Sequence, residues 1–309
     1  MSFSIVFPGQ GSQSVGMLAD LASEWPQVGE TFAEASDALG YDLWTLVQEG
    51  PDADLNQTDK TQPAMLAAGI ATWRVWNAAG GAAPSHVVGH SLGEYTALVA
   101  AGALEFSTAV KLVEKRGQLM QAAVPEGHGA MAAILGLTDD AVVKACDEAA
   151  QGSVVQAVNF NAPGQVVVAG TTAAVGRAVE LCKEVGAKRA LLLSVSVPSH
   201  CSLMQPAAEK LAEAMADIEI KAPDITVLHN VDAAAHGDTT GICTALERQL
   251  YNPVRWVETI QALSAAGVES IVECGPGKIL TGLNKRIDRG MSALPVFDSA
   301  SLQKALDAL

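Results

Sequence analysis

The chain alternates between short, almost wholly apolar runs and longer stretches whose hydrophobic residues recur at helical spacing. The apolar runs at 4–7 and 85–88 predict buried strands. Amphipathic stretches predict helices at 25–39, 62–79 and 107–124. Near-continuously apolar strands that alternate with helices are typical of a parallel sheet covered on both faces. We therefore expect an α/β fold.

The middle of the chain follows a different order. Six elements are expected there: a strand at 130–135, a helix at 138–150, strands at 154–160 and 165–169, a helix at 171–185 and a strand at 190–195. This β-α-β-β-α-β order is that of the ferredoxin-like arrangement. We predict a small ferredoxin-like (βαββαβ) subdomain over 128–196, inserted into a large α/β-hydrolase-like domain formed by 1–127 and 197–309.

The bulk properties exclude several classes of protein. No apolar run in the 309 residues approaches the roughly 20 needed to cross a bilayer, and the N-terminus is expected to be a first strand, not a signal peptide. A net charge of −15 argues against non-specific nucleic-acid binding. Five scattered cysteines without a Cys-x-x-Cys pair favour reduced thiols in a cytoplasm over disulfides or a metal site.

A glycine-flanked serine lies between a predicted strand and a predicted helix. Residues 89–93 (Gly-His-Ser-Leu-Gly) follow the apolar run at 85–88 and precede an Ala/Leu/Val-rich stretch at 92–104. A sharp strand-to-helix turn needs small residues on both sides, and it exposes the serine at its apex beside the helix N-terminus. The alternative is a structural Gly-Ser loop, but the context favours Ser91 as a nucleophile.

The glycine-rich segments do not carry a nucleotide-binding motif. The segment Gly-Gln-Gly at 9–11 is followed by Ser14 where the dinucleotide fingerprint needs glycine, and Gly-Pro-Gly-Lys at 275–278 lacks the first glycine and the Ser/Thr of a phosphate loop. The loop at 8–11 instead follows the first strand, at the edge where open α/β sheets bind ligands. It can supply a backbone N–H group to an oxyanion hole.

A serine nucleophile needs a general base, and two histidines qualify. His200 and His229 each directly follow a predicted strand, and spacing does not separate them. The other four lie within a strand, beside the serine but pointing away from it, or in polar and glycine-rich loops: His86, His90, His128 and His236.

Arg116 falls on the apolar face of its predicted helix. A guanidinium that faces the core is costly unless it is paired. Two explanations stay open at this point: a structural ion pair with Glu94 or Asp42, or a clamp for a substrate carboxylate.

Five motifs occur together and in order along the chain. They are Phe-Pro-Gly-Gln-Gly-Ser-Gln at 7–13, Gly-His-Ser-Leu-Gly-Glu-Tyr at 89–95, Lys-Arg-Gly at 115–117, Val-Pro-Ser-His at 197–200 and Gly-Pro-Gly-Lys at 275–278. In this set the chain resembles the malonyl-CoA:acyl carrier protein transacylases of type II fatty-acid synthesis over essentially its whole length.

The resemblance implies a ping-pong reaction through an acylated serine. Ser91 would be the nucleophile that malonyl-CoA acylates, and His200 would be its base. The main-chain carbonyl of Gln249 would orient the imidazole, and the backbone N–H groups of Gln10 and Leu92 would form the oxyanion hole.

The resemblance also assigns the recognition of substrates. Arg116 would bind the malonyl carboxylate, and Gln62 and Asn159 match further polar positions of the pocket. The coenzyme A thioester is the substrate, so no cofactor is expected. The expected partners are malonyl-CoA and a phosphopantetheinylated acyl carrier protein, without nucleic acid or membrane, and the expected state is a monomer.

An acidic carrier protein would be repelled by an enzyme of charge −15 unless basic residues gather locally. Two close basic pairs, Lys188 with Arg189 and Lys285 with Arg286, are the candidates for docking. The alternative is ordinary solvated surface charge.

Rival functions share parts of this pattern. A serine esterase or thioesterase would keep Ser91 and His200, and an acyltransferase of polyketide synthesis would keep the whole set. A non-catalytic carrier-binding module would keep the fold without needing an intact nucleophile.

Overall fold

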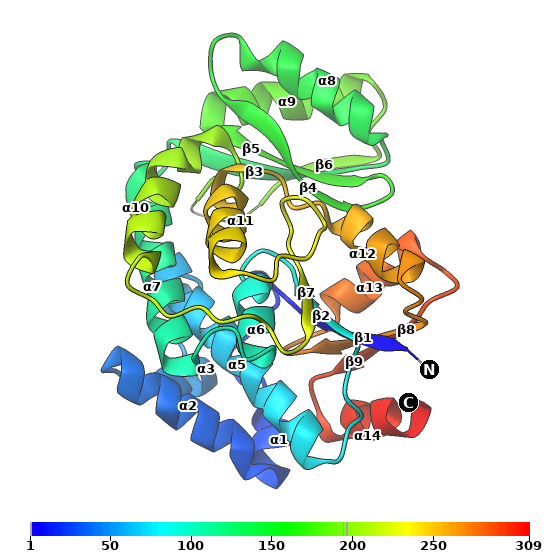
Figure 1. Ribbon diagram of the computed structural model, residues 1–309. Coiled ribbons are helices and arrows are strands. Elements are labelled where there is room, and N and C mark those ends of the chain that lie inside the picture. The colour runs from blue at the N-terminus through cyan, green and yellow to red at the C-terminus, as the bar shows by residue number, and fades with distance from the viewer. Residues whose placement is uncertain (1, 194, 196) are drawn as a thin grey trace.

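The chain forms two sheets, one parallel and one antiparallel, that lie one above the other (Figure 1). This computed structural model describes residues 2–193, 195 and 197–309. The parallel sheet has the order β7-β2-β1-β8-β9. Its strands are β1 (Phe3–Phe7), β2 (His86–Gly89), β7 (Thr226–Leu228), β8 (Ser270–Cys274) and β9 (Ser292–Val296).

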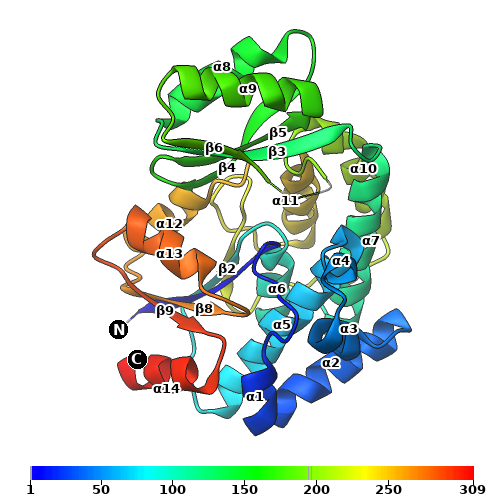
Figure 2. The same cartoon turned by 180° about the vertical axis from the view of Figure 1, so that it is seen from behind.

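Helices cover both faces of the parallel sheet, as the apolar strands predict. Ile5 and Phe7 of β1 pack in one hydrophobic cluster with α2, α5 and α7, whereas Val6 between them packs in another with α12 and α13. Figures 1 and 2 show these helix groups on opposite sides of the sheet. Around this sheet lie α1 (Ala19–Glu24), α2 (Pro26–Leu39), α3 (Leu43–Glu49), α4 (Asp52–Leu55), α5 (Thr58–Ala78), α6 (Gly93–Ala100), α7 (Phe106–Ala123), η1 (Ser202–Met204), α10 (Gln205–Met215), α11 (Thr239–Tyr251), α12 (Trp256–Ala265), α13 (Ile279–Ile287) and α14 (Ser299–Ala308).

The antiparallel sheet has the order β4-β5-β3-β6 and carries two helices on one face. Its elements are β3 (Gly129–Leu135), α8 (Asp139–Ala150), β4 (Val155–Ala162), β5 (Gln165–Thr171), α9 (Thr172–Glu184) and β6 (Arg189–Leu192). On its other face, Met131, Val158 and Val167 pack against Cys201, the residue that precedes η1. The predicted mixed α/β fold class with a separate βαββαβ sheet is confirmed. The domain bounds remain a proposal, and residue 196 lies outside the described residues.

Three predicted elements differ from those in the structure. The helix expected at 92–104 ends at Ala100, and Gly102 beyond it takes the left-handed backbone that closes a helix (φ 73°). The helix expected from 62 begins at Thr58. The strand expected at 190–195 ends at Leu192, its last residue paired with β3; Val195 is not in a strand, and position 194 is outside the described residues.

The edge strand β4 ties the small sheet to the rest of the molecule. The backbone N–H of Phe160 donates to the carbonyl of Val254 (3.0 Å), and the N–H of Val254 donates to the carbonyl of Val158 (2.9 Å). This bridge holds the open face of the small sheet over the carboxyl ends of the parallel strands.

The described part of the chain contains no helix long and apolar enough to cross a membrane. The five cysteines, all within it, are free thiols. No group of histidine, cysteine or acidic side chains among the described residues is arranged to hold a metal ion.

Candidate active site

Ser91 occupies a strained turn between β2 and α6. Its φ of 53° lies in the left-handed region, which residues other than glycine seldom adopt. The flanking glycines are required by close packing: a Cβ at Gly89 would lie 1.8 Å from the carbonyl carbon of Gly93, and a Cβ at Gly93 would lie 2.1 Å from the oxygen of Phe7. The predicted strand-to-helix turn is therefore present, with the serine at its apex.

Asn230 fixes the backbone of this turn. The N–H of Ser91 donates to Asn230 Oδ1 (2.6 Å), and Asn230 Nδ2 donates to the carbonyl of Gly89 (2.7 Å). No sequence motif singles out this asparagine. Its position could have indicated a role, because Asn230 follows β7 at the same edge of the sheet as Ser91.

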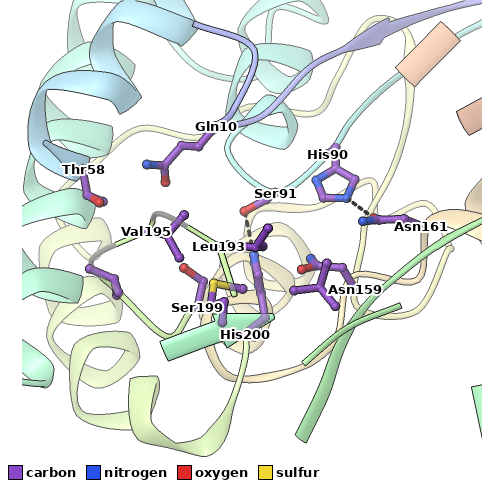
Figure 3. Close-up of a pocket in the computed structure, with 13 residues that line it drawn as sticks. Gln10, Thr58, His90, Ser91, Asn159, Asn161, Leu193, Val195, Ser199 and His200 are labelled. Carbon is purple, nitrogen blue, oxygen red and sulfur yellow. Dashed lines mark hydrogen bonds between the residues drawn. The ribbon is translucent and has the colours of Figure 1, made fainter. Parts of the chain in front are cut away.

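The hydroxyl of Ser91 is paired with His200, as Figure 3 shows. Ser91 Oγ lies 2.7 Å from His200 Nε2, and His200 Nδ1 lies 2.7 Å from the main-chain oxygen of Gln249. Since a carbonyl only accepts, Nδ1 carries the proton and Nε2 is free to accept one from the serine. Burial, and secondly the charge of Arg116, lower the pKa of His200 to about 3, so its imidazole is neutral at pH 7.

The second candidate histidine has a different partner. His229 is fully buried, and its Nδ1 lies 2.7 Å from Glu94 Oε1. Of the two histidines that spacing left open, only His200 contacts the serine. His90 points away from Ser91, toward Asn161 of β4 (2.8 Å, Figure 3). The ring of His90 lies against that of Trp256.

Two backbone N–H groups are placed beside Ser91. Leu92 precedes the first residue of α6, and Gln10 lines the pocket on the loop after β1 (Figure 3). No described residue accepts a hydrogen bond from either N–H. The Gln10 loop is pressed against the turn, since a Cβ at Gly9 would lie 2.6 Å from the carbonyl oxygen of His90.

Arg116 of α7 is a fully buried cation next to the nucleophile. Its Nη1 donates to Gln62 Oε1 (2.7 Å), and its Nη2 donates to Gln249 Oε1 (2.9 Å) and to Ser91 Oγ (3.3 Å). The guanidinium carbon lies 5.4 Å from the ring centroid of Tyr95. Its Nε has no partner among the described residues, and burial lowers the pKa of this arginine.

The ion-pair explanation of Arg116 is wrong for both acids considered. Asp42 is exposed and instead caps α3 through the N–H of Thr45. Glu94 is buried nearby but forms no direct ion pair with Arg116; the side chain of Gln249 stands between them. Within the described residues, no carboxylate neutralises this guanidinium at ion-pair distance. The site therefore has an unpaired positive charge beside a nucleophile.

The pocket in front of Ser91 is a cavity of about 210 Å³ between the two sheets. Its floor comes from the loops of the parallel sheet, and its roof from the open face of the small sheet. Asn159 of β4 lines the roof, whereas Gln62 lies behind Arg116. The apolar part of the wall is formed by Met131, Val167, Leu193, Val195 and Val197.

The four candidate docking residues are exposed: Lys188 directly precedes β6, which begins at Arg189, and Lys285 and Arg286 lie in the last turn of α13. Leu135 of β3 is paired with Arg189 on one side and with Gln165 on the other. Arg286, in the last turn of α13, donates to Gln165 Oε1 and to the carbonyl of Pro163. Since strands lie about 4.8 Å apart, Gln165 and Arg189 are about 10 Å apart. The register thus places Arg189 two strands away from Gln165, the residue that Arg286 contacts.

Comparisons with known proteins find acyl transferases that match nearly the full chain. Residues 4–295 match the model of the acyl transferase domain. The malonyl CoA-acyl carrier protein transacylase of Haemophilus influenzae is 61% identical over 97% of this chain and 96% of its own.

Solved structures agree in fold. An acyl carrier protein S-malonyltransferase from Vibrio cholerae superposes with a TM-score of 0.96 at 61% identity, over 98% of this chain and 99% of its own. A malonyl-transacylase in complex with its type II PKS acyl-carrier protein superposes with a TM-score of 0.99 at 58% identity, over the full length of both chains.

Proposed function

This chain belongs to the malonyl CoA-acyl carrier protein transacylase family of acyl transferases, and on that premise we propose that it moves the malonyl group from malonyl-CoA to the phosphopantetheine thiol of an acyl carrier protein. One observation carries the choice of acyl group: the unpaired guanidinium of Arg116 lies 3.3 Å from the oxygen of Ser91. A buried cation in that position favours an acyl chain that ends in a carboxylate.

In the first half-reaction, Ser91 is acylated. His200 Nε2 accepts the hydroxyl proton while Oγ attacks the thioester carbonyl. The resulting oxyanion accepts hydrogen bonds from the N–H groups of Gln10 and Leu92, each contributing about 3 kcal/mol to the transition state. When the tetrahedral intermediate collapses, the C–S bond breaks, the thiol of coenzyme A leaves with the proton from His200, and malonyl-serine remains.

In the second half-reaction, the carrier thiol takes the place of coenzyme A. His200 accepts the thiol proton, the sulfur attacks the ester carbonyl, and the same two N–H groups hold the oxyanion. Collapse breaks the C–O bond and returns the proton to Ser91. Both substrates react through the same pocket in front of Ser91. No cofactor beyond the thioester is needed.

Arg116 would recognise the malonyl carboxylate with its remaining donors. Two glutamine oxygens hold its Nη1 and Nη2, and its buried Nε is left without a partner. A carboxylate in the pocket would supply the missing counter-charge, whereas an acetyl methyl group would leave the cation unpaired. A neutral-ester hydrolase would gain nothing from such a group, which argues against the esterase alternative.

The carrier protein would dock at the two basic pairs. Charge reversal of Lys188 and Lys285 together should raise the KM for the carrier about tenfold at low salt, and added salt should narrow the difference from wild type. The matched control reverses Lys210 and Lys304, which are exposed on α10 and α14. Equal changes in the two double variants would leave docking at these pairs without support.

The proposed function does not specify which acyl carrier protein is the native acceptor or which pathway it serves. One relative works with a type II PKS acyl-carrier protein, so carriers of both fatty-acid and polyketide systems should be compared as acceptors. A cytoplasmic location and a monomeric state remain predictions.

Intact-mass measurement tests the proposal as a whole. After mixing with malonyl-CoA, the wild-type chain should gain one malonyl group, and an acyl carrier protein should remove it. Ser91→Ala should gain none. Rapid hydrolysis without a thiol acceptor would indicate an esterase, and the absence of an adduct would indicate a non-catalytic module.

A further inference from the structure

A closed cluster of polar side chains lies behind Arg116, out of reach of any substrate. Glu94, in the first turn of α6, is fully buried, and so are His229, Asn230 and Gln249. Isolated buried carboxylates are costly, so Glu94 needs a structural or functional reason to be there. The proposed reaction steps do not use it.

The carboxylate of Glu94 collects three hydrogen-bond donors. Its Oε1 is 2.7 Å from His229 Nδ1, and its Oε2 accepts from the backbone N–H of Asn230 (2.9 Å) and from Gln249 Nε2 (2.9 Å). An ionised carboxylate can only accept. Gln249 must therefore present its NH₂ group, and not its oxygen, to Glu94.

This constraint decides what Gln249 presents to Arg116. With its Nε2 held by Glu94 and by the carbonyl of Ser91 (3.0 Å), the amide directs Oε1 at Arg116 Nη2 (2.9 Å). The reversed amide would place its NH₂ against the guanidinium and its oxygen against the carboxylate. Both contacts would be repulsive, so Glu94, together with the Ser91 carbonyl, favours the orientation in which Oε1 faces Arg116.

The intervening amide also keeps the arginine available. A carboxylate in direct contact with Arg116 would form the ion pair that the substrate is meant to form. One amide further away, Glu94 supplies a negative charge nearby but leaves the Nε–H of the guanidinium without an acceptor among the described residues. The amide dipole of Gln249 connects the two charges.

We propose that Glu94 is a positioning residue that sets malonyl specificity by holding the Gln249 amide, and through it Arg116, in the orientation that receives a carboxylate. This inference rests on the proposed function and deepens it. Glu94 itself touches no substrate.

The test is the ratio of kcat/KM for malonyl-CoA to kcat/KM for acetyl-CoA, measured in the full chain. In Glu94→Ala the acceptor is gone, and the ratio should fall about tenfold to a hundredfold, the range expected for losing a hydrogen bond to a charged group. In Glu94→Gln an amide oxygen can still accept from Asn230 and Gln249, while its NH₂ donates to the other tautomer of His229. This variant should keep the ratio within about threefold of wild type.

The matched control is Glu273→Gln. Glu273 is a similarly buried carboxylate on β8 that accepts from the N–H groups of Leu280 and Thr281. It belongs to a different hydrogen-bond cluster from that of Arg116. Its loss should lower stability without moving the substrate ratio. A merely structural role for Glu94 would make Glu94→Ala behave in the same way.

A second variant keeps the test decisive if Glu94→Ala does not fold. Gln249→Met removes the side-chain amide that Glu94 holds, so it should lower the malonyl-to-acetyl ratio of kcat/KM to the same extent. An unchanged ratio in either variant, or an equal loss in Glu94→Gln and Glu94→Ala, would overturn the proposal. A wild-type chain that gains no malonyl adduct would instead overturn the proposed function.

Discussion

The dyad end of the site, Ser91 with His200, and the arginine end, Arg116 with its two glutamines, are stabilised in opposite ways. At the dyad end most partners are neutral: the main-chain carbonyl of Gln249 orients His200, and Asn230 holds the backbone N–H of Ser91, while Arg116 adds one longer contact (3.3 Å) to Ser91 Oγ. At the arginine end they are side chains that surround a permanent charge. The first arrangement prepares for charge that appears only during reaction, and the second for charge that the substrate brings.

Removal of the nucleophile should have the largest effect. Ser91→Ala is expected to lower transfer to the carrier by about 10⁴-fold or more, because no other group can form the covalent intermediate. Initial rates measured by separating malonylated from free carrier give this number. Since Arg116 keeps its contacts with Gln62 and Gln249, malonyl-CoA should still bind, and loss of binding as well would contradict the separation of the two ends.

Removal of the arginine should change selectivity more than chemistry. Arg116→Ala is expected to lower kcat/KM for malonyl-CoA by about 10²- to 10³-fold, the range for truncating one partner of a buried charge pair. Acetyl transfer should change far less. Parallel assays with both thioesters check this, and equal losses for the two substrates would disprove the clamp.

A methyl group on the oxyanion loop should affect both substrates alike. The Cβ of Gly9→Ala would lie 2.6 Å from the His90 carbonyl, so the loop must shift and carry the Gln10 N–H with it. The expected cost is about 10²-fold in kcat for malonyl and acetyl transfer. Gly29→Ala, on the open surface of α2, is the matched control and should be neutral.

The smallest effect is a shift in the pH profile that links the two ends. Because the pKa of His200 is lowered to about 3 by burial and then by Arg116, the acid limb of kcat/KM for acetyl-CoA should lie well below pH 6.5. Arg116→Ala removes the second cause and should move this limb to higher pH, while burial keeps it below the ordinary value. An unmoved limb would mean that the ends are electrostatically independent.

The same shift has a consequence for stability. Between the ordinary pKa of histidine and about pH 3, the unfolded chain binds a proton at His200 that the folded chain does not. Stability contributed at this site is therefore present above pH 6.5 and declines as the pH falls through that window.

Local features were accessible from the sequence. The turn around Ser91 is dictated by two glycines within five residues, and the core-facing position of Arg116 follows from one helix periodicity. The fold class follows from the alternation of elements in the same way. The residue roles that the resemblance supplied remain proposals, although the geometry agrees with them.

The cluster behind Arg116 was not accessible, because its members come from distant segments. Glu94 and Gln249 are 155 positions apart, and Ser91 and Asn230 are 139 positions apart. No periodicity reports on such contacts. The ion pair with Glu94, one of two explanations that the sequence left open, failed for the same reason, because the sequence does not reveal the glutamine between Glu94 and Arg116.

The bridge between β4 and Val254 determines the side from which a long substrate can approach. It pins one edge of the small sheet, whereas the opposite edge, β6, continues into Leu193 and Val195, which line the pocket and are 37% and 46% exposed. On the proposed function, a tethered thiol would enter past β6, the strand that begins at Arg189. Delivery of the arm and reception of the carrier's charge would then occur along one strand.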